Sequence, residues 1–239
     1  MAGALLEVEG LTKRFGGFTA LNRVSLYVKA GERLGLIGPN GSGKTTLINC
    51  VSGTLRCEGG TIRFAGHDIT AMPAHRRTHL GIVRTFQIPK PFASMTVLDN
   101  LRIPIEYTAH RHGADALVNA TGILELMGLV AKAQTIASAL TQIEMRKLEL
   151  ARALAAKPKL LVADEAMAGL SSGEVDDILT ILFRLNEQGI TIIMIEHIMR
   201  AVMRFSERIV VLDAGERIAE GTPEEIVKNP AVEKAYLGE

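Results

Sequence analysis

The sequence has few cysteines, no tryptophan and almost no excess of charge of either sign. Cys50 and Cys57 are the two cysteines in 239 residues, so a disulfide framework is excluded and reduced thiols of a cytosolic protein are expected. A net charge of +1 argues against nucleic acid as a main partner, because domains that bind nucleic acid usually carry a basic surplus. No apolar run reaches the length of a membrane span, and the N-terminus shows no signal sequence. If the protein works at a membrane, we expect it to do so through a partner.

A glycine-rich stretch from Gly38 to Thr46 reads GPNGSGKTT and fits the phosphate-binding pattern G-x-x-x-x-G-K-[ST]. The apolar run at 34–37 predicts a buried strand before it, and residues 46–51 can continue as a helix. A glycine-rich turn that binds nothing is the alternative, but the fixed positions and the correct flanks argue against it. Lys44 is predicted to bind the β- and γ-phosphates of a nucleotide, and the Thr45 hydroxyl to bind Mg²⁺. The predicted nucleotide-binding residues of the loop are Gly38, Asn40, Gly41, Ser42, Gly43, Lys44, Thr45 and Thr46.

The rest of the pattern predicts an α/β fold with a parallel sheet. Buried apolar runs alternate with helical segments in the second half of the chain, which is typical of a parallel sheet covered on both faces. A loop is expected at 12–17, and residues 96–156 are helical in pattern. Strands are predicted at 5–8, 24–28, 34–37, 61–64, 82–86, 160–163, 190–195 and 209–212.

Polar residues follow several of these strands directly. Gln87, the pair Asp164-Glu165, and His197 each stand where a predicted strand ends. Ligands of open parallel sheets bind beyond the carboxyl ends of the strands, so these residues are expected to meet near the glycine loop. Asp164 is predicted to hold Mg²⁺, and Glu165 to orient or deprotonate a water molecule. Taken singly, the acidic pair could cap a helix, and Gln87 and His197 could be ordinary polar residues.

The order of these motifs, with Phe15 before them, resembles the ATPase subunit of ABC transporters over the whole chain. The resemblance implies an α/β fold of the P-loop NTPase (RecA-like) class, with a parallel-sheet core, an antiparallel β subdomain and a helical subdomain. It implies one domain, with the core at about 1–88 and 158–239 and the helical part at about 89–157.

The same resemblance assigns roles to single residues. By it, ATP and Mg²⁺ are the cofactors, and Phe15 stacks on adenine, with Phe18 the next candidate. Gln87 links Mg²⁺ and water to a transmembrane partner, and His197 contacts the γ-phosphate. Residues 168–171 look like the loop that crosses the interface of a cassette dimer.

Within the family, three segments resemble importers of branched-chain amino acids, namely 81–87, 95–101 and 229–239. This implies an Mg-dependent ATPase on the cytoplasmic face of the inner membrane, bound to permease subunits and served indirectly by a substrate-binding protein. A soluble ABC ATPase of translation or DNA repair, or an importer cassette for another small solute, are the alternatives.

One segment departs from the family. Its signature, Leu-Ser-Gly-Gly-Gln, falls on residues 140–144, which read LTQIE. Thr141 keeps a hydroxyl and is expected to contact the nucleotide of the opposite subunit, whereas Gln142 and Ile143 place side chains where close backbone approach is needed. A heterodimer with a second, ordinary cassette is therefore expected, with a homodimer as the alternative. Ala166 also replaces a proline that is usual after the catalytic glutamate.

Overall fold

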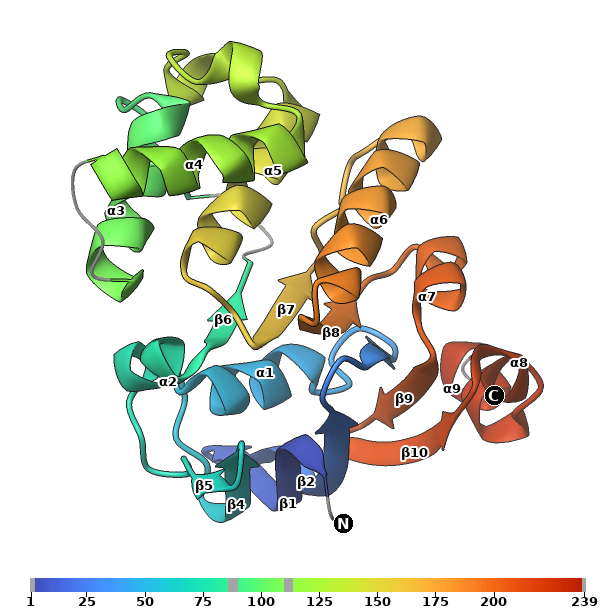
Figure 1. Cartoon of the computed structure of the whole chain (residues 1–239). Coiled ribbons are helices and arrows are strands. Elements are labelled where there is room, and N and C mark those ends of the chain that lie inside the picture. Colours follow the sequence, from blue (N-terminus) through green and yellow to red (C-terminus); the bar gives the residue numbers. More distant parts are fainter. Residues whose placement is uncertain (1–2, 86–89, 110–113, 238–239) are drawn as a thin grey trace.

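The computed structural model describes residues 3–85, 90–109 and 114–237 (Figure 1). Its larger sheet has the strand order β10-β9-β3-β8-β7-β6. The strands from β9 to β6 run parallel, and β10 pairs antiparallel with β9 at one edge. The bounds are β3 Arg33–Ile37, β6 Ile82–Arg84, β7 Leu160–Asp164, β8 Thr191–Ile195, β9 Arg208–Asp213 and β10 Glu216–Gly221. The parallel sheet predicted from the alternating apolar runs is confirmed.

A second, antiparallel sheet has the order β2-β1-β4-β5. Its strands are β1 Ala4–Phe15, β2 Phe18–Lys29, β4 Gly59–Phe64 and β5 His67–Asp68. The loop expected at 12–17 is wrong over Thr12 to Phe15, because β1 continues to Phe15, which lies opposite Phe18 across the Gly16-Gly17 turn. The two strands remain paired through several register shifts along this hairpin, and this cross-strand pairing overrides local sequence preference.

The helices lie in several parts of the fold (Figure 1). Helix α1 lies between the two sheets, α3, α4 and α5 form a separate group at the top of the view, and α6 and α7 lie near β7 and β8. The bounds are α1 Lys44–Ser52, α2 Ala74–Leu80, α3 Val97–Ala109, α4 Ala114–Met127, α5 Gln142–Ala155, α6 Ser172–Glu187, α7 Met199–Phe205, α8 Pro223–Val227 and α9 Pro230–Leu237, with 3₁₀ turns at Val130–Lys132 and Ala137–Ala139. In the described ranges, no helix combines the length and the apolar character needed to cross a bilayer.

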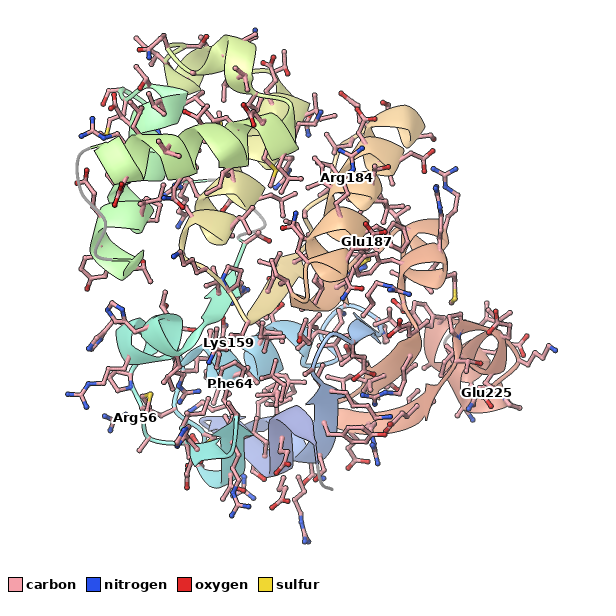
Figure 2. The ribbon with its side chains drawn as sticks, viewed as in Figure 1. Arg56, Phe64, Lys159, Arg184, Glu187 and Glu225 are labelled. Atoms are coloured by element: carbon pink, nitrogen blue, oxygen red, sulfur yellow. The ribbon has the colours of Figure 1, made fainter. Side chains whose placement is uncertain are left out.

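Side chains that alternate along each parallel strand build two separate apolar clusters. Val162 and Ile193 join the cluster that holds α1 and the antiparallel sheet, whereas Leu161 and Ile192 join the cluster of α5, α6 and α7. Phe64, labelled in Figure 2, is 1% exposed and belongs to the first cluster. Both faces of the sheet are thus covered, which leaves its strand ends as the place for a ligand.

Candidate nucleotide-binding site

The glycine-rich loop connects β3 to α1 and fits only glycine at two of its positions. Gly38 has φ 150°, and a Cβ there would lie 2.0 Å from the carbonyl oxygen of Leu212. Gly43 has φ 102°, and a Cβ there would lie 2.7 Å from the carbonyl oxygen of Ala20 on β2. Neither approach tolerates a side chain. The loop therefore packs tightly on both sheets, and α1 points its N-terminal N–H groups into the site, as phosphate binding requires.

Lys44 begins α1 and is only 7% exposed. Its ammonium donates hydrogen bonds to the carbonyl oxygens of Gly38 at 2.8 Å and Pro39 at 2.9 Å. Burial lowers the pKa of Lys44, while the nearby carboxylates of Glu165 and Asp164 act in the opposite direction. The loop's own carbonyls therefore hold a buried cation beside two carboxylates, where an anion with several oxygens would be bound.

A cavity of about 280 Å³ opens above this loop. Most of the residues predicted for nucleotide binding surround it, together with Glu165 and His197 from the ends of β7 and β8. The lining residues are Phe15, Phe18, Ala20, Asn40, Gly41, Ser42, Gly43, Lys44, Thr45, Thr46, Glu165, Ile195 and His197. The structure thus brings together residues spread over most of the chain, with aromatic rings, hydroxyls and an ammonium in one cavity.

Two aromatic rings border the cavity at the tip of the β1–β2 hairpin. Phe15 is 48% exposed and Phe18 is 64% exposed, so both rings are accessible to a ligand in the cavity. The Lys13 ammonium lies 5.1 Å from the centroid of the Phe15 ring, so one face of that ring already carries a cation. Both rings can stack on a base, and Phe15 is the one that Lys13 helps to hold in place.

Asp164 ends β7 and is 4% exposed. Its carboxylate forms an ion pair with the guanidinium of Arg84 on β6, and Arg84 also donates to the side-chain oxygen of Asn49 on α1. The N–H of Asp164 donates to the hydroxyl of Thr85 at 3.1 Å. Sequence reasoning did not single out Arg84 or Asn49. A basic residue inside an apolar strand was the available signal for Arg84.

The oxygen donors near the phosphate loop fit Mg²⁺. Within the described ranges, no group of three or more His, Cys, Asp or Glu side chains gathers to hold a metal by itself. The Thr45 hydroxyl and the Asp164 carboxylate are hard oxygen donors, and Mg²⁺ is usually held by one or two carboxylates with phosphate oxygens and water. The chemistry of this donor set suits Mg²⁺ bound together with a nucleotide.

Glu165 has a strained backbone and a histidine neighbour. Its φ of 47° lies in the left-handed region, and its N–H donates to the carbonyl oxygen of Ile195 at 2.8 Å. One carboxylate oxygen lies 3.2 Å from Nε2 of His197. The two polar residues predicted at neighbouring strand ends are therefore in direct contact, and a strained residue of this kind is a common feature of functional sites.

Comparison with known proteins identifies the family. The ABC transporter model matches residues 21–168 of the chain. The chain belongs to the ABC transporter ATP-binding family. ABC proteins of this type are nucleotide-binding ATPases, and so is this cassette. A second model, described as a branched-chain amino acid ATP-binding cassette transporter, matches residues 216–239.

Similar proteins span the whole ABC chain. It is 40% identical over 258 residues to the high-affinity branched-chain amino acid transport ATP-binding protein BraF of Pseudomonas aeruginosa, with all of both chains covered. It is 39% identical over 254 residues to LivG of Escherichia coli, which carries the same description, again with all of both chains covered. A crystal structure of the ADP conformation of MJ1267, an ATP-binding cassette of an ABC transporter, has a TM-score of 0.90 at 36% identity and covers 99% of both chains.

The altered ABC signature forms the N-terminus of α5, away from the cavity lining. Thr141 caps the helix, and its hydroxyl accepts from the N–H of Glu144 at 3.4 Å. The Glu144 carboxylate accepts from the N–H of Thr141 at 2.9 Å and pairs with the ammonium of Lys132 at 3.2 Å. The Thr141 N–H and then Lys132 hold the pKa of Glu144 below its ordinary value. A carboxylate thus occupies the helix start to which the family brings a phosphate.

Gln142, in the place of the first signature glycine, binds the loop that follows Glu165. Its amide nitrogen donates to the carbonyl oxygen of Ala168 at 3.3 Å, and Arg146 donates to the same oxygen at 3.2 Å. A Cβ at Gly169 would lie 2.4 Å from the Gln142 nitrogen, so the two segments are in close contact. Sequence reasoning treated Gln142 only as an obstacle to close approach and missed this contact.

Gln87 lies outside the described residues, and the description resumes at Lys90. The residues that follow are held by the helical group. The N–H of Phe92 donates to the side-chain oxygen of Asn100 at 2.8 Å, and Arg152 donates to the Lys90 carbonyl oxygen at 2.7 Å. The Phe92 ring, 43% exposed, lies 5.2 Å from the Arg152 guanidinium. Lys90 and Phe92 are therefore anchored to α3 and α5.

Proposed function

We propose that this ABC cassette is the ATP-binding subunit of an importer for branched-chain or other hydrophobic amino acids. The observation that carries the proposal is the match of residues 216–239 to the branched-chain amino acid cassette model. Full-length similarity to BraF and LivG supports the same assignment. The chain aligns with BraF and LivG over their whole length without a long insertion, which does not favour a role in translation or DNA repair.

We assign the chemistry to the residues around the cavity. The loop N–H groups and Lys44 bind the β- and γ-phosphates of ATP, and a phenylalanine of the hairpin, Phe15 in the first place, stacks on adenine. Thr45 and Asp164 hold Mg²⁺, which neutralises charge on the phosphates when bound. Because the Asp164 carboxylate pairs with Arg84 here, we expect that pair to loosen as the site fills.

Hydrolysis is assigned to the two strand ends. Glu165 orients the attacking water and accepts its proton, and His197, in contact with that carboxylate, faces the γ-phosphate. Gln87 is assigned to link this centre to the permease. The Lys90 to Phe92 segment beyond it, fixed to α3 and α5, is assigned to transmit the movement.

We propose that the working unit is a head-to-tail heterodimer. The related cassette MJ0796 is described as dimeric in a post-hydrolysis state bound to ADP and Pi, with a TM-score of 0.83 at 26% identity, covering 91% of this chain and 98% of that one. In such a dimer, Thr141 would face the partner's ATP. The neighbouring Glu144 carboxylate would repel the phosphates, since like charges at close range are unfavourable. A partner with an ordinary signature would instead complete the site formed by Lys44 and Glu165.

The proposal places the dimer on the cytoplasmic face of the inner membrane, bound to permease subunits, with a substrate-binding protein as an indirect partner. Purification from native membranes tests it. We expect permease subunits and a second ABC cassette to copurify, and vesicles containing the complex and its binding protein to take up leucine, isoleucine or valine when ATP is supplied on the cassette side. Copurification with ribosomes, or ATP-driven uptake of an unrelated solute only, would contradict it.

A further inference from the structure

Glu196 directly precedes His197 in the sequence and contacts the segment that follows Glu165. Both of those residues have assigned roles, whereas Glu196 has none so far. It follows β8 directly, it is 4% exposed, and its carboxylate accepts a hydrogen bond from the N–H of Met167 at 2.9 Å. An ionisable side chain is seldom buried this completely without a specific reason, because removing the charged form from water is costly. Packing alone would be served by an apolar residue.

Two other contacts accompany that of Glu196 between residues at and just after the ends of β7 and β8. On one side, the N–H of Glu165 donates to the carbonyl oxygen of Ile195 at 2.8 Å. On the other, the carboxylate of Glu165 meets Nε2 of His197 at 3.2 Å. The hydrogen bond from Met167 to Glu196 is the one that connects the backbone beyond Glu165 to the residue just before His197.

From this geometry we propose that Glu196 is a positioning residue for ATP hydrolysis. By accepting a hydrogen bond from the N–H of Met167, it fixes the positions of Glu165 and His197 relative to each other. The proposal rests on the roles assigned to Glu165 and His197 under the proposed function. Glu165 needs such support, because its backbone conformation is strained and persists only where the surroundings fix it. Without the Met167 contact, the backbone after Glu165 loses its hydrogen bond to the side chain that directly precedes His197.

The surroundings of Glu196 agree with a role that depends on an acceptor atom. Burial is the first cause that raises its pKa to about 7, and the carboxylates of Glu165 and Asp164 add to this while Arg146 opposes it. The side chain is therefore partly protonated near neutral pH, and a carbonyl oxygen of the neutral acid still accepts a hydrogen bond. A glutamine oxygen can do the same.

The test uses the assembled complex with Glu196→Gln, Glu196→Asp and Glu196→Ala, and Glu187→Gln as a control at an exposed acid of α6 (Figure 2). We expect Glu196→Gln to keep kcat within about threefold, because the acceptor stays in place. Glu196→Asp keeps the charge but withdraws the acceptor by one methylene, and together with Glu196→Ala it is expected to lose kcat about 10- to 100-fold with little change in the KM for ATP.

Two results would overturn the proposal. One is a parental kcat in Glu196→Asp. The other is a loss of kcat in Glu196→Gln as large as that in Glu196→Ala, which would show that the acceptor atom is not the important property. If Glu196→Ala does not fold, the kcat values of Glu196→Gln and Glu196→Asp are sufficient to test the proposal. Glu165→Gln is measured beside them, since parental turnover in that variant would refute the assigned role of Glu165 whatever the Glu196 variants show.

Discussion

The side-chain amide of Gln142 is hydrogen-bonded to the carbonyl oxygen of Ala168, three residues beyond Glu165. A residue that stands where the family has a signature glycine therefore binds the loop after Glu165 in its own subunit. Because the Glu144 carboxylate also lies at the start of α5, we expect the signature end to bind phosphate poorly.

The purified chain alone is expected to be a weak ATPase because its signature end is altered. Changing Gln142 and Ile143 to glycine and Glu144 to glutamine should raise its turnover, since the helix start is then cleared of side chains and of negative charge. Phosphate release by the isolated chain measures this, with Gln188→Gly as the control at an exposed helix end. Rapid, cooperative hydrolysis by the unmodified chain would count against the heterodimer.

Glu165→Gln should retain binding of Mg·ATP and lose most hydrolysis in the complex. The carboxylate is assigned to water rather than to binding, and the contribution of a general base is typically about 10²- to 10⁴-fold. Nucleotide titration and single-turnover kinetics separate the two effects. Lys44→Ala is the contrasting variant, because it should weaken nucleotide binding itself.

Phe15→Ala should weaken ATP binding, whereas Phe15→Tyr should be tolerated. Stacking of an aromatic side chain on a base is worth roughly 1–3 kcal/mol and does not depend on a hydrogen bond, so ATP and GTP should be discriminated only modestly. Phe18→Ala is the matched variant on the other side of the turn. If only Phe18→Ala reduces the affinity, the base lies on Phe18.

The stability of the fold should fall as the pH rises from about 4.5 to 7 because of Glu196. Its pKa of about 7 in the folded state lies above its ordinary value of 4.5, so folding favours the protonated form and the folded state binds the extra proton in this window. Below this pH range Glu196 is protonated in both the folded and the unfolded state. Above it, ionised Glu196 lowers the free energy of unfolding by its full amount, on the order of 3 kcal/mol. Urea unfolding at pH 5 and 7.5 should show this loss in the parent but not in Glu196→Gln.

Gly43→Ala should destabilise the chain and weaken nucleotide binding. The new Cβ would lie 2.7 Å from the Ala20 carbonyl oxygen in a backbone conformation that disfavours side chains, a strain of roughly 1–3 kcal/mol. Gly173→Ala is the control, because it lies in α6 with open space around it. Thermal unfolding with and without ATP separates the structural effect from the effect on binding.

Local patterns in the sequence were sufficient for the phosphate loop and the strand ends. Lys44, Glu165 and His197 meet in one cavity because a strand–loop–helix motif and parallel strands fix where each chain segment ends. The ion pair of Arg84 with Asp164 and the bond of Gln142 to Ala168 join residues 80 and 26 positions apart. No local periodicity encodes such contacts.

The prediction of a loop at 12–17 was wrong over its first four residues for a related reason. Residues from Thr12 to Phe15 have a composition that is compatible with a loop, and only their partners on β2 make them a strand. The reciprocal hydrogen bonds of Thr141 and Glu144 follow from a local pattern, because a Thr followed three residues later by Glu is typical of a helix start.

The close packing of Gly43 on Ala20 fixes the distance between the phosphate loop and the tip of the β1–β2 hairpin. Ala20 lies on the same strand as Phe18, and that strand begins at the turn that carries Phe15, so the aromatic rings and the phosphate loop are spaced by a few residues of rigid β-structure. If the base stacks on a hairpin ring and the phosphates bind the loop, we expect the cavity to select ligands by the distance from base to terminal phosphate. A nucleoside monophosphate can reach one end only, whereas a triphosphate reaches both. The preference for ATP over AMP is thus expected to come from this spacing together with the contacts assigned to Lys44 and His197 at the β- and γ-phosphates.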